Sequence, residues 1–152
     1  MRDARRVKMM VLRPLGQIAH LWPFGRRRVL VLEDDTMMQK LVGKLLRSLH
    51  VRVDFFGNGR DVVHKIETEG EQYDALLLDL MMPHQGGLTV LRHLQVHHAS
   101  WLSRVVLMTG SGSSITDPWS RLVFAVVHKP FDGSTLVSSV QACLQQPESL
   151  VA

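Results

Sequence analysis

From residue 29 onward, short apolar runs alternate with longer segments in which apolar residues recur at helical spacing. The apolar runs are rich in Val and Leu and are continuous, which is typical of strands covered on both faces of a sheet. They predict five strands, at VLVL (29–32), VRVDFF (51–56), ALLLD (75–79), RVVLMTG (104–110) and FAVVHKP (124–130).

Four of the intervening segments have the periodicity of amphipathic helices. Thr36 is placed as the N-cap of the first of these helices, and Gly70 closes the second. The predicted helices are TMMQKLVGKLLRSLH (36–50), NGRDVVHKIETEG (58–70), LTVLRHLQVHH (88–98) and STLVSSVQACLQQ (134–146).

Strands that alternate with helices in this way predict an α/β domain whose parallel sheet is wound on both faces. In that architecture the functional crevice lies beyond the carboxyl ends of the strands. The polar strand endings should therefore meet at one rim, and they are Glu33, Asp34 and Asp35 after the first strand, Asp79 after the third, Thr109 after the fourth and Lys129 after the fifth.

Three or four carboxylates at one rim would repel one another unless a divalent cation neutralised them. Ligands that are all oxygen suit Mg²⁺, which keeps several waters and accepts phosphate oxygens. Lys129 adds a positive charge able to hold a phosphoryl oxygen or Asp79, and Thr109 offers a hydroxyl donor. This set favours in-line attack by the Asp79 carboxylate on phosphorus, which gives an acyl phosphate.

Four motifs, VLVLEDD, LLLDLMMP with Gly87, VVLMTG and VVHKPF, occur in this order at suitable spacing. Together they make residues 29 to about 146 resemble a response-regulator receiver domain of two-component signalling. The resemblance implies a flavodoxin-like, doubly wound, five-stranded parallel sheet of strand order 2-1-3-4-5.

The resemblance also implies roles for individual residues. Glu33 and Asp34 would hold Mg²⁺, and Asp79 would be both the phosphoacceptor and a metal ligand. The Met81 backbone carbonyl would be a further metal ligand, and Thr109 would supply the switch hydroxyl. Lys129 would correspond to the lysine that the family carries at the end of its fifth strand. A cis Lys129–Pro130 peptide is predicted, and Asp35 is expected to be a solvated loop residue.

The chain departs from the family pattern in its output region. A Gly/Ser-rich run and Asp117–Pro118 leave room for at most two turns around Trp119 to Leu122, so the fourth helix is predicted to be short or irregular. Val126 stands where the family often has an aromatic residue, so a threonine-to-ring relay cannot operate in its ordinary form. Gly86 replaces an acidic residue and is expected to loosen the loop after Asp79 without removing a site group.

Histidines on the third helix suggest a metal site, because positions four apart share a face. His93, His97 and His98 lack a third ligand at any convincing spacing, so a solvated helix face is the favoured interpretation. His64 and His128 have no obvious catalytic partner. The single cysteine, Cys143, excludes an internal disulfide and is interpreted as a small buried hydrophobic residue.

Charge divides the chain unevenly. Residues 1–28 hold eight of the 18 Lys and Arg residues but one of the 14 acidic residues, which leaves 10 basic and 13 acidic residues in 29–152. We therefore predict a basic, flexible N-terminal extension (1–28), a receiver domain (29–146) and a short tail (147–152). The extension has the charge to touch nucleic acid or an anionic surface but lacks a specific binding pattern. No membrane span is predicted, and a cytoplasmic location is expected.

The leading hypothesis is a stand-alone receiver that is not an enzyme beyond its own phosphorylation and dephosphorylation. It would take a phosphoryl group from a histidine kinase or phosphotransfer protein and act through an unknown protein partner. A pseudo-receiver, which binds partners regardless of phosphorylation, is the main alternative. A haloacid-dehalogenase-type phosphatase is disfavoured because Met81 occupies the position of that family's acid.

Overall fold

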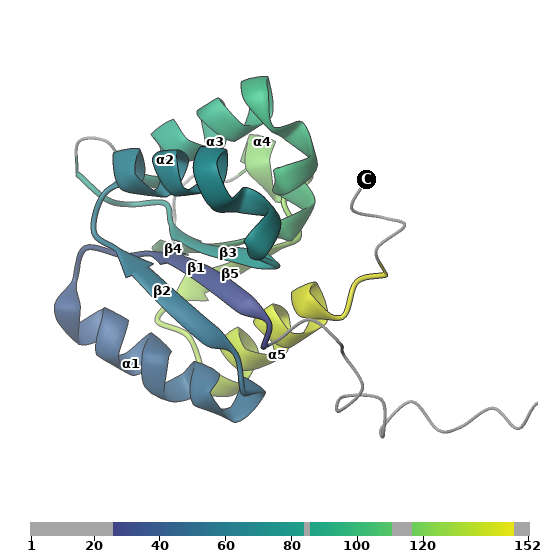
Figure 1. The fold of residues 1–152 in the computed structure, drawn as a ribbon. Coiled ribbons are helices and arrows are strands. Elements are labelled where there is room, and N and C mark those ends of the chain that lie inside the picture. The colour runs from purple at the N-terminus through teal and green to yellow at the C-terminus, as the bar shows by residue number, and fades with distance from the viewer. Residues whose placement is uncertain (1–25, 84–85, 111–116, 148–152) are drawn as a thin grey trace, which may run out of the picture.

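The sheet of the computed structural model has five parallel strands in the order β2-β1-β3-β4-β5 (Figure 1). The structure describes residues 26–83, 86–110 and 117–147. The strands are β1 (Arg28–Leu32), β2 (Arg52–Phe56), β3 (Ala75–Asp79), β4 (Val105–Gly110) and β5 (Ala125–Lys129). The predicted fold class and strand order are confirmed.

Helices cover both faces of the sheet. In Figure 1, α2 (Gly59–Glu69), α3 (Gly87–His97) and α4 (Asp117–Ser120) lie on one face, and α1 (Thr36–Leu46) and α5 (Gly133–Leu144) on the other. The fourth helix is a single turn, as the Gly/Ser-rich run and Asp117–Pro118 predicted. Short 3-10 segments follow three helices, η2 (Arg47–Leu49), η3 (Gly70–Gln72) and η4 (Ala99–Arg104).

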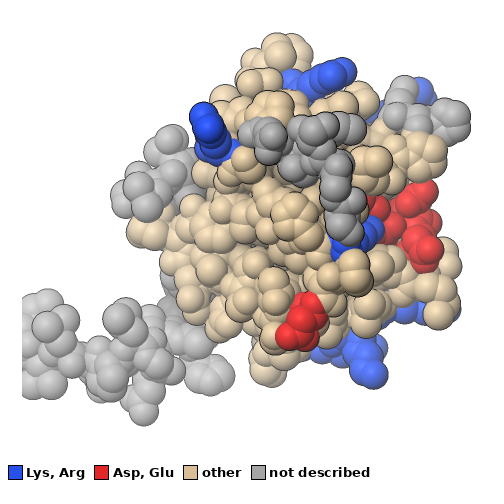
Figure 2. All heavy atoms as spheres, turned by 180° about the vertical axis from the view of Figure 1, so that it is seen from behind, with Lys and Arg blue, Asp and Glu red and all other residues tan. Residues whose placement is uncertain are grey.

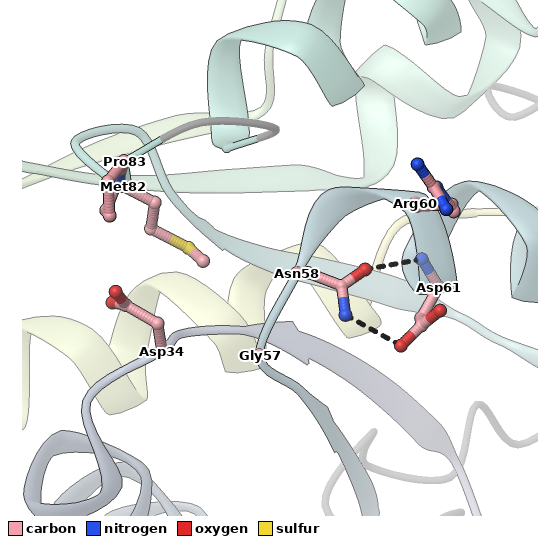
Figure 3. A pocket seen from close by; sticks show the side chains of 7 residues that line it. All are labelled: Asp34, Gly57, Asn58, Arg60, Asp61, Met82 and Pro83. Carbon is pink, nitrogen blue, oxygen red and sulfur yellow. Dashed lines mark hydrogen bonds between the residues drawn. The ribbon is translucent and has the colours of Figure 1, made fainter.

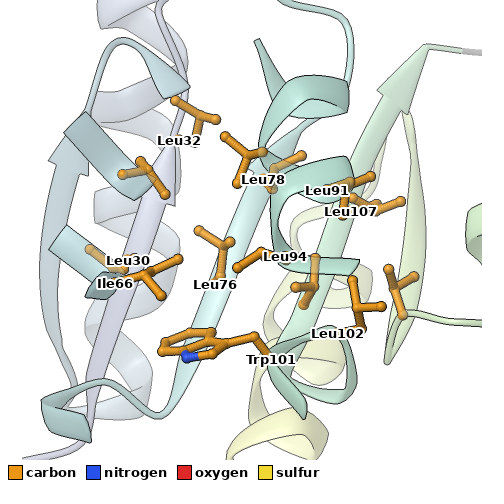
Figure 4. Close-up of a cluster of buried hydrophobic side chains, with 14 of the residues drawn as sticks. Leu30, Leu32, Ile66, Leu76, Leu78, Leu91, Leu94, Trp101, Leu102 and Leu107 are labelled. Atoms are coloured by element: carbon orange, nitrogen blue, oxygen red, sulfur yellow. The ribbon is translucent and has the colours of Figure 1, made fainter. Parts of the chain in front are cut away.

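The core consists of two layers because successive strand side chains point to opposite faces. Leu30, Leu76 and Leu107 face α2 and α3, and Figure 4 shows them against Ile66, Leu91, Leu94 and Trp101. The sequence neighbours of these three leucines, Val31, Leu77 and Val106, point to the opposite face and pack against α1 and α5. Cys143 belongs to this second layer and is 2% exposed, which confirms its interpretation as a buried hydrophobic residue.

The first helix begins differently from the prediction. Thr36 is the first residue of α1, and Asp35 is its N-cap, with one carboxylate oxygen accepting from the backbone N–H groups of Met37 (2.7 Å) and Met38 (2.9 Å). Thr36 as N-cap was therefore wrong. Asp35 is exposed, as expected, but it stabilises the helix because a carboxylate both accepts from free N–H groups and opposes the positive end of the helix dipole.

At the amino end of the sheet, a polar cluster joins Arg28 of β1, Asp54 of β2 and Tyr73. One guanidinium nitrogen of Arg28 donates to Asp54 (2.6 Å) and to the Tyr73 hydroxyl (2.8 Å), and that hydroxyl donates to Asp54 (2.7 Å). Arg28 is also the first residue of β1, so the domain begins one residue before the predicted start at residue 29.

The predicted N-terminal extension, except for Arg26–Arg28, and the tail from residue 148 lie outside the described residues. Within the described part of the chain, no helix is both long and apolar enough to cross a membrane.

Candidate functional site

The carboxyl ends of the strands bring Glu33, Asp79, Thr109 and Lys129 to one rim. Asp79 is paired in register with Met108 of β4, and Thr109 with His128 of β5, so the rim runs across adjacent strands. Glu33, Asp79 and Thr109 are the buried polar or charged side chains among the described residues. Burying such groups is costly unless they have partners. These three side chains at the rim therefore need contacts that compensate for their burial.

Lys129 joins two of these carboxylates. Its Nζ donates to Asp79 Oδ2 at 2.9 Å and to Glu33 Oε2 at 3.2 Å. Burial alone would lower the pKa of Lys129, but the hydrogen bond and charge of Asp79, together with Glu33, outweigh burial and raise it. Lys129 is thus held as a cation between two carboxylates.

Each carboxylate also accepts a backbone N–H. Asp79 Oδ1 accepts from Met81 N and Glu33 Oε1 from Asp35 N, both at 3.0 Å. Burial raises the pKa of Glu33, and the charge of Asp79 adds to that effect against the opposing influence of Asp35 N–H and Lys129. These contacts orient the acidic groups, since each has one oxygen bound by backbone and the other by Lys129.

Glu33, Asp34 and Asp79 form a cluster whose ligand oxygens lie within 4.8 Å of one another. Asp34 is exposed while the other two are buried, so the cluster opens to solvent on one side. The single cation of Lys129 cannot balance three carboxylates, and an all-oxygen donor set suits Mg²⁺. The residues present therefore fit a magnesium ion.

The rim borders a hollow between the first turn of α2 and the segment after β3. Figure 3 shows Asp34 on one side, Met82 and Pro83 on another, and Asn58, Arg60 and Asp61 on the third. The carboxyl ends of the strands lie at the left in Figure 1 and at the right in Figure 2, where acidic side chains gather beside a lysine or arginine. A ligand that reaches the acidic cluster can enter from this side.

Close packing fixes the backbone behind Asp79. A Cβ on Gly87 would collide with the Asp79 carbonyl oxygen and with Leu78 Cδ2, and one on Gly86 with the Met82 carbonyl oxygen. Both glycines are buried. The sequence predicted that Gly86 loosens the loop after Asp79. Residues 84–85 of this loop lie outside the described residues.

The proposed switch region is arranged as follows. Thr109 is fully buried and its hydroxyl donates to the Gly110 carbonyl oxygen at 3.4 Å. Val126 is partly buried and packs against the apolar layer that contains Leu107. The Lys129–Pro130 peptide is cis, as predicted.

The structure brings together one group that the sequence did not connect. Glu67 of α2 lies beside His93 and His98, and their ligand atoms are within 4.8 Å of one another. A third metal-ligating type of side chain, which the sequence spacing did not provide, therefore lies beside the histidines and comes from another helix. The adjacency of the second and third helices could have suggested this contact, but no sequence spacing marks Glu67.

Comparisons with known proteins agree with this geometry. The family model described as response regulator receiver domain matches residues 29–141. The chain belongs to this family. Among solved structures, it is similar to the signal receiver domain of a putative LuxO repressor protein from Vibrio parahaemolyticus, with 24% identity, TM-score 0.68 and coverage of 80% of this chain and 92% of that one. A CheY-like receiver domain protein from Methanospirillum hungatei JF-1 has 20% identity, TM-score 0.70 and coverage of 82% and 98%.

The curated relatives are matched over only part of their own length. The chain is 30% identical over 125 residues to the transcriptional activator protein IrlR of Burkholderia pseudomallei, which covers 80% of the chain and 52% of the relative. It is 33% identical over 84 residues to the 3',5'-cyclic-nucleotide phosphodiesterase regA of Dictyostelium discoideum, covering 55% of the chain and 11% of the relative. The chain therefore spans about half or less of the length of these relatives.

Proposed function

We propose that the protein is a stand-alone receiver that accepts a phosphoryl group on Asp79 from a histidine kinase or phosphotransfer protein. The observation that carries this proposal is the position of Asp79, buried at the strand end with Lys129 on one oxygen and Glu33 and Asp34 beside it. Its output would be contact with a protein partner in the cytoplasm.

Glu33, Asp34, Asp79 and the Met81 backbone carbonyl would hold the magnesium ion. When bound, Mg²⁺ neutralises the carboxylates and phosphoryl oxygens that otherwise repel one another. An Asp79 oxygen attacks phosphorus while the phosphorus–nitrogen bond of the donor phosphohistidine breaks, and the bond electrons stay with the imidazole, which takes up a proton. Lys129 then offers its ammonium to a phosphoryl oxygen, and Thr109 offers its hydroxyl.

Intact-mass spectrometry after incubation with acetyl phosphate tests this proposal. We expect one phosphoryl group per chain in the presence of Mg²⁺ and none with chelator or in Asp79→Asn. Asp35→Asn is a matched control, because its carboxylate caps α1, whereas its contact with Glu33 is made by the backbone N–H, which Asn keeps. Phosphorylation that persists in Asp79→Asn would overturn the assignment.

A pseudo-receiver remains a second candidate, supported by Val126 and by the single turn of α4. It predicts that partner binding is equal for phosphorylated and unphosphorylated protein. The phosphatase alternative lacks a general acid at Met81, whose exposed thioether carries no transferable proton. We accordingly propose no enzymatic activity beyond self-catalysed phosphorylation and dephosphorylation.

A further inference from the structure

On the α2–α3 face, three side chains from two helices converge away from the acidic rim. Glu67 lies in the last turns of α2, His93 lies in α3, and His98 directly follows α3. Their ligand atoms lie within 4.8 Å of one another, and His93 Nε2 is 3.1 Å from Glu67 Oε1. The geometry points to a second metal site, for a divalent transition ion such as Zn²⁺, held by Glu67, His93 and His98.

The state of His93 supports this assignment. Its Nε2 atom is buried, yet it has no hydrogen bond of acceptable geometry to any described residue, although Glu67 Oε1 is near. A buried polar nitrogen without a partner is costly, and a metal ion would satisfy it. The approach to Glu67 is close in distance but does not meet the direction that a hydrogen bond needs.

The donor set distinguishes this site from the rim. Two imidazoles with one carboxylate suit Zn²⁺ and its neighbours in the first transition row, whereas oxygen donors alone suit Mg²⁺. Ligand atoms around a tetrahedral zinc stand about 3.3 Å apart, given bonds of about 2.0–2.1 Å. The ligand atoms of Glu67, His93 and His98 lie at most 4.8 Å from one another, so each needs to move by only about 1 Å toward their centre to bind zinc.

The local field also favours a cation here. Glu67 is near the carboxyl end of α2, and His98 is the C-cap residue of α3, so the negative ends of two helix dipoles lie close to the cluster. The first turn of α2 lines the hollow at Asp34, and Glu67 lies about 12 Å further along the helix axis. The two metal sites are therefore separate, and this inference does not depend on the phosphoryl chemistry.

Calorimetric titration of the tag-free chain with ZnCl₂ in Mg²⁺-saturated buffer tests the site. We expect one Zn²⁺ per chain, and a loss of affinity of at least about tenfold in each of Glu67→Gln, His93→Gln and His98→Gln. Glu67 is 47% exposed, so Glu67→Gln leaves the packing of the helices intact.

Matched controls separate this site from other zinc binding. His50→Asn removes a histidine with a φ of 53°, a conformation that Asn tolerates, and should leave affinity unchanged. Asp79→Asn should also leave it unchanged. With Co²⁺, the visible absorption of a tetrahedral ion should appear in the native chain and be lost in His98→Gln. Absence of Zn²⁺ binding would show that Glu67, His93 and His98 lie close together without holding a metal, and loss of affinity in Asp79→Asn alone would place zinc at the rim; either result overturns the inference.

Discussion

Lys129 Nζ lies 2.9 Å from Asp79 Oδ2, although the two residues end strands that are not neighbours, β5 and β3, with β4 between them. The long lysine side chain crosses the end of β4 to reach the carboxylate, and it also reaches Glu33 beyond. One cation thus holds two buried carboxylates, Glu33 directly after β1 and Asp79 at the end of β3.

Replacing this cation should destabilise the fold. Lys129→Met leaves Asp79 and Glu33 facing each other without a positive charge, and we expect the free energy of unfolding in Mg²⁺-free buffer to fall by about 1–3 kcal/mol. This range lies below that of fully buried pairs because the Lys129 side chain is 24% exposed. Urea denaturation measures the change. The double variant Lys129→Met, Asp79→Asn should recover part of it, and unchanged stability of the single variant would contradict the role of Lys129.

Magnesium affinity should depend on Asp34 but not on Asp35. Asp34→Asn removes one charge from the carboxylate cluster, and we expect Mg²⁺ binding to weaken about tenfold or more. Asp35→Asn should bind Mg²⁺ as the native chain does and keep its stability, because Asn caps a helix about as well as Asp. Calorimetric titration with MgCl₂ compares the two variants. Equal weakening in both would mean that only net charge at the rim matters.

Gly87 should not tolerate a methyl group. In Gly87→Ala the new Cβ meets the carbonyl oxygen of Asp79, so we expect a loss of about 1–3 kcal/mol in the free energy of unfolding. Gly57→Ala is the matched control, because nothing lies within 4 Å of its Cβ position, and its stability should change by less than about 0.5 kcal/mol. Thermal and urea denaturation of both variants test this contrast, which equal effects would refute.

Tyr73 should ionise only at very high pH. Burial and the hydrogen bond to Asp54 raise its pKa from 10.0 to about 12. Because the folded-state pKa lies above the unfolded one, the stabilisation is complete below pH 10 and is lost as pH rises toward 12. Tyr73 is the only tyrosine, so ultraviolet absorbance of the phenolate reports it alone.

We expect the native midpoint near 12, a midpoint near 10 in denaturant, and a lower native midpoint in Asp54→Asn. Tryptophan fluorescence monitors folding during the titration. Phenolate that forms near pH 10 while the protein is still folded would contradict the described cluster.

Cys143 should be unreactive in the folded protein. It is buried on α5, burial raises the pKa of its thiol to about 12, and thiolate is the reactive form. Ellman's reagent at pH 8 should therefore label the native chain very slowly and the denatured chain completely. Because the sequence contains one cysteine, the labelling kinetics refer to this residue alone. Rapid labelling of the native protein would show that α5 opens readily.

Most of the fold could be predicted from the sequence because its signals are local. Continuous runs of Val and Leu mark buried parallel strands, and the alternation with helices restricts the topology. The short fourth helix followed from Asp117–Pro118 in the same way. Thr36 was mistaken for the N-cap because both Asp35 and Thr36 can cap a helix, and only the backbone conformation of Asp35, with ψ of 116°, decides between them.

Prediction of the site likewise succeeded where the signals are local and failed where they depend on tertiary contacts. The sequence by itself determined that Glu33, Asp34, Asp79, Thr109 and Lys129 would share one rim, because parallel strands place their carboxyl ends at one edge. Only the tertiary structure decided which atoms meet, namely that Lys129 joins Glu33 to Asp79, that Arg28 joins Asp54 to Tyr73, and that Glu67 completes the cluster at His93. These contacts connect residues far apart in the chain, so they depend on how helices and strands pack rather than on any periodicity in the sequence.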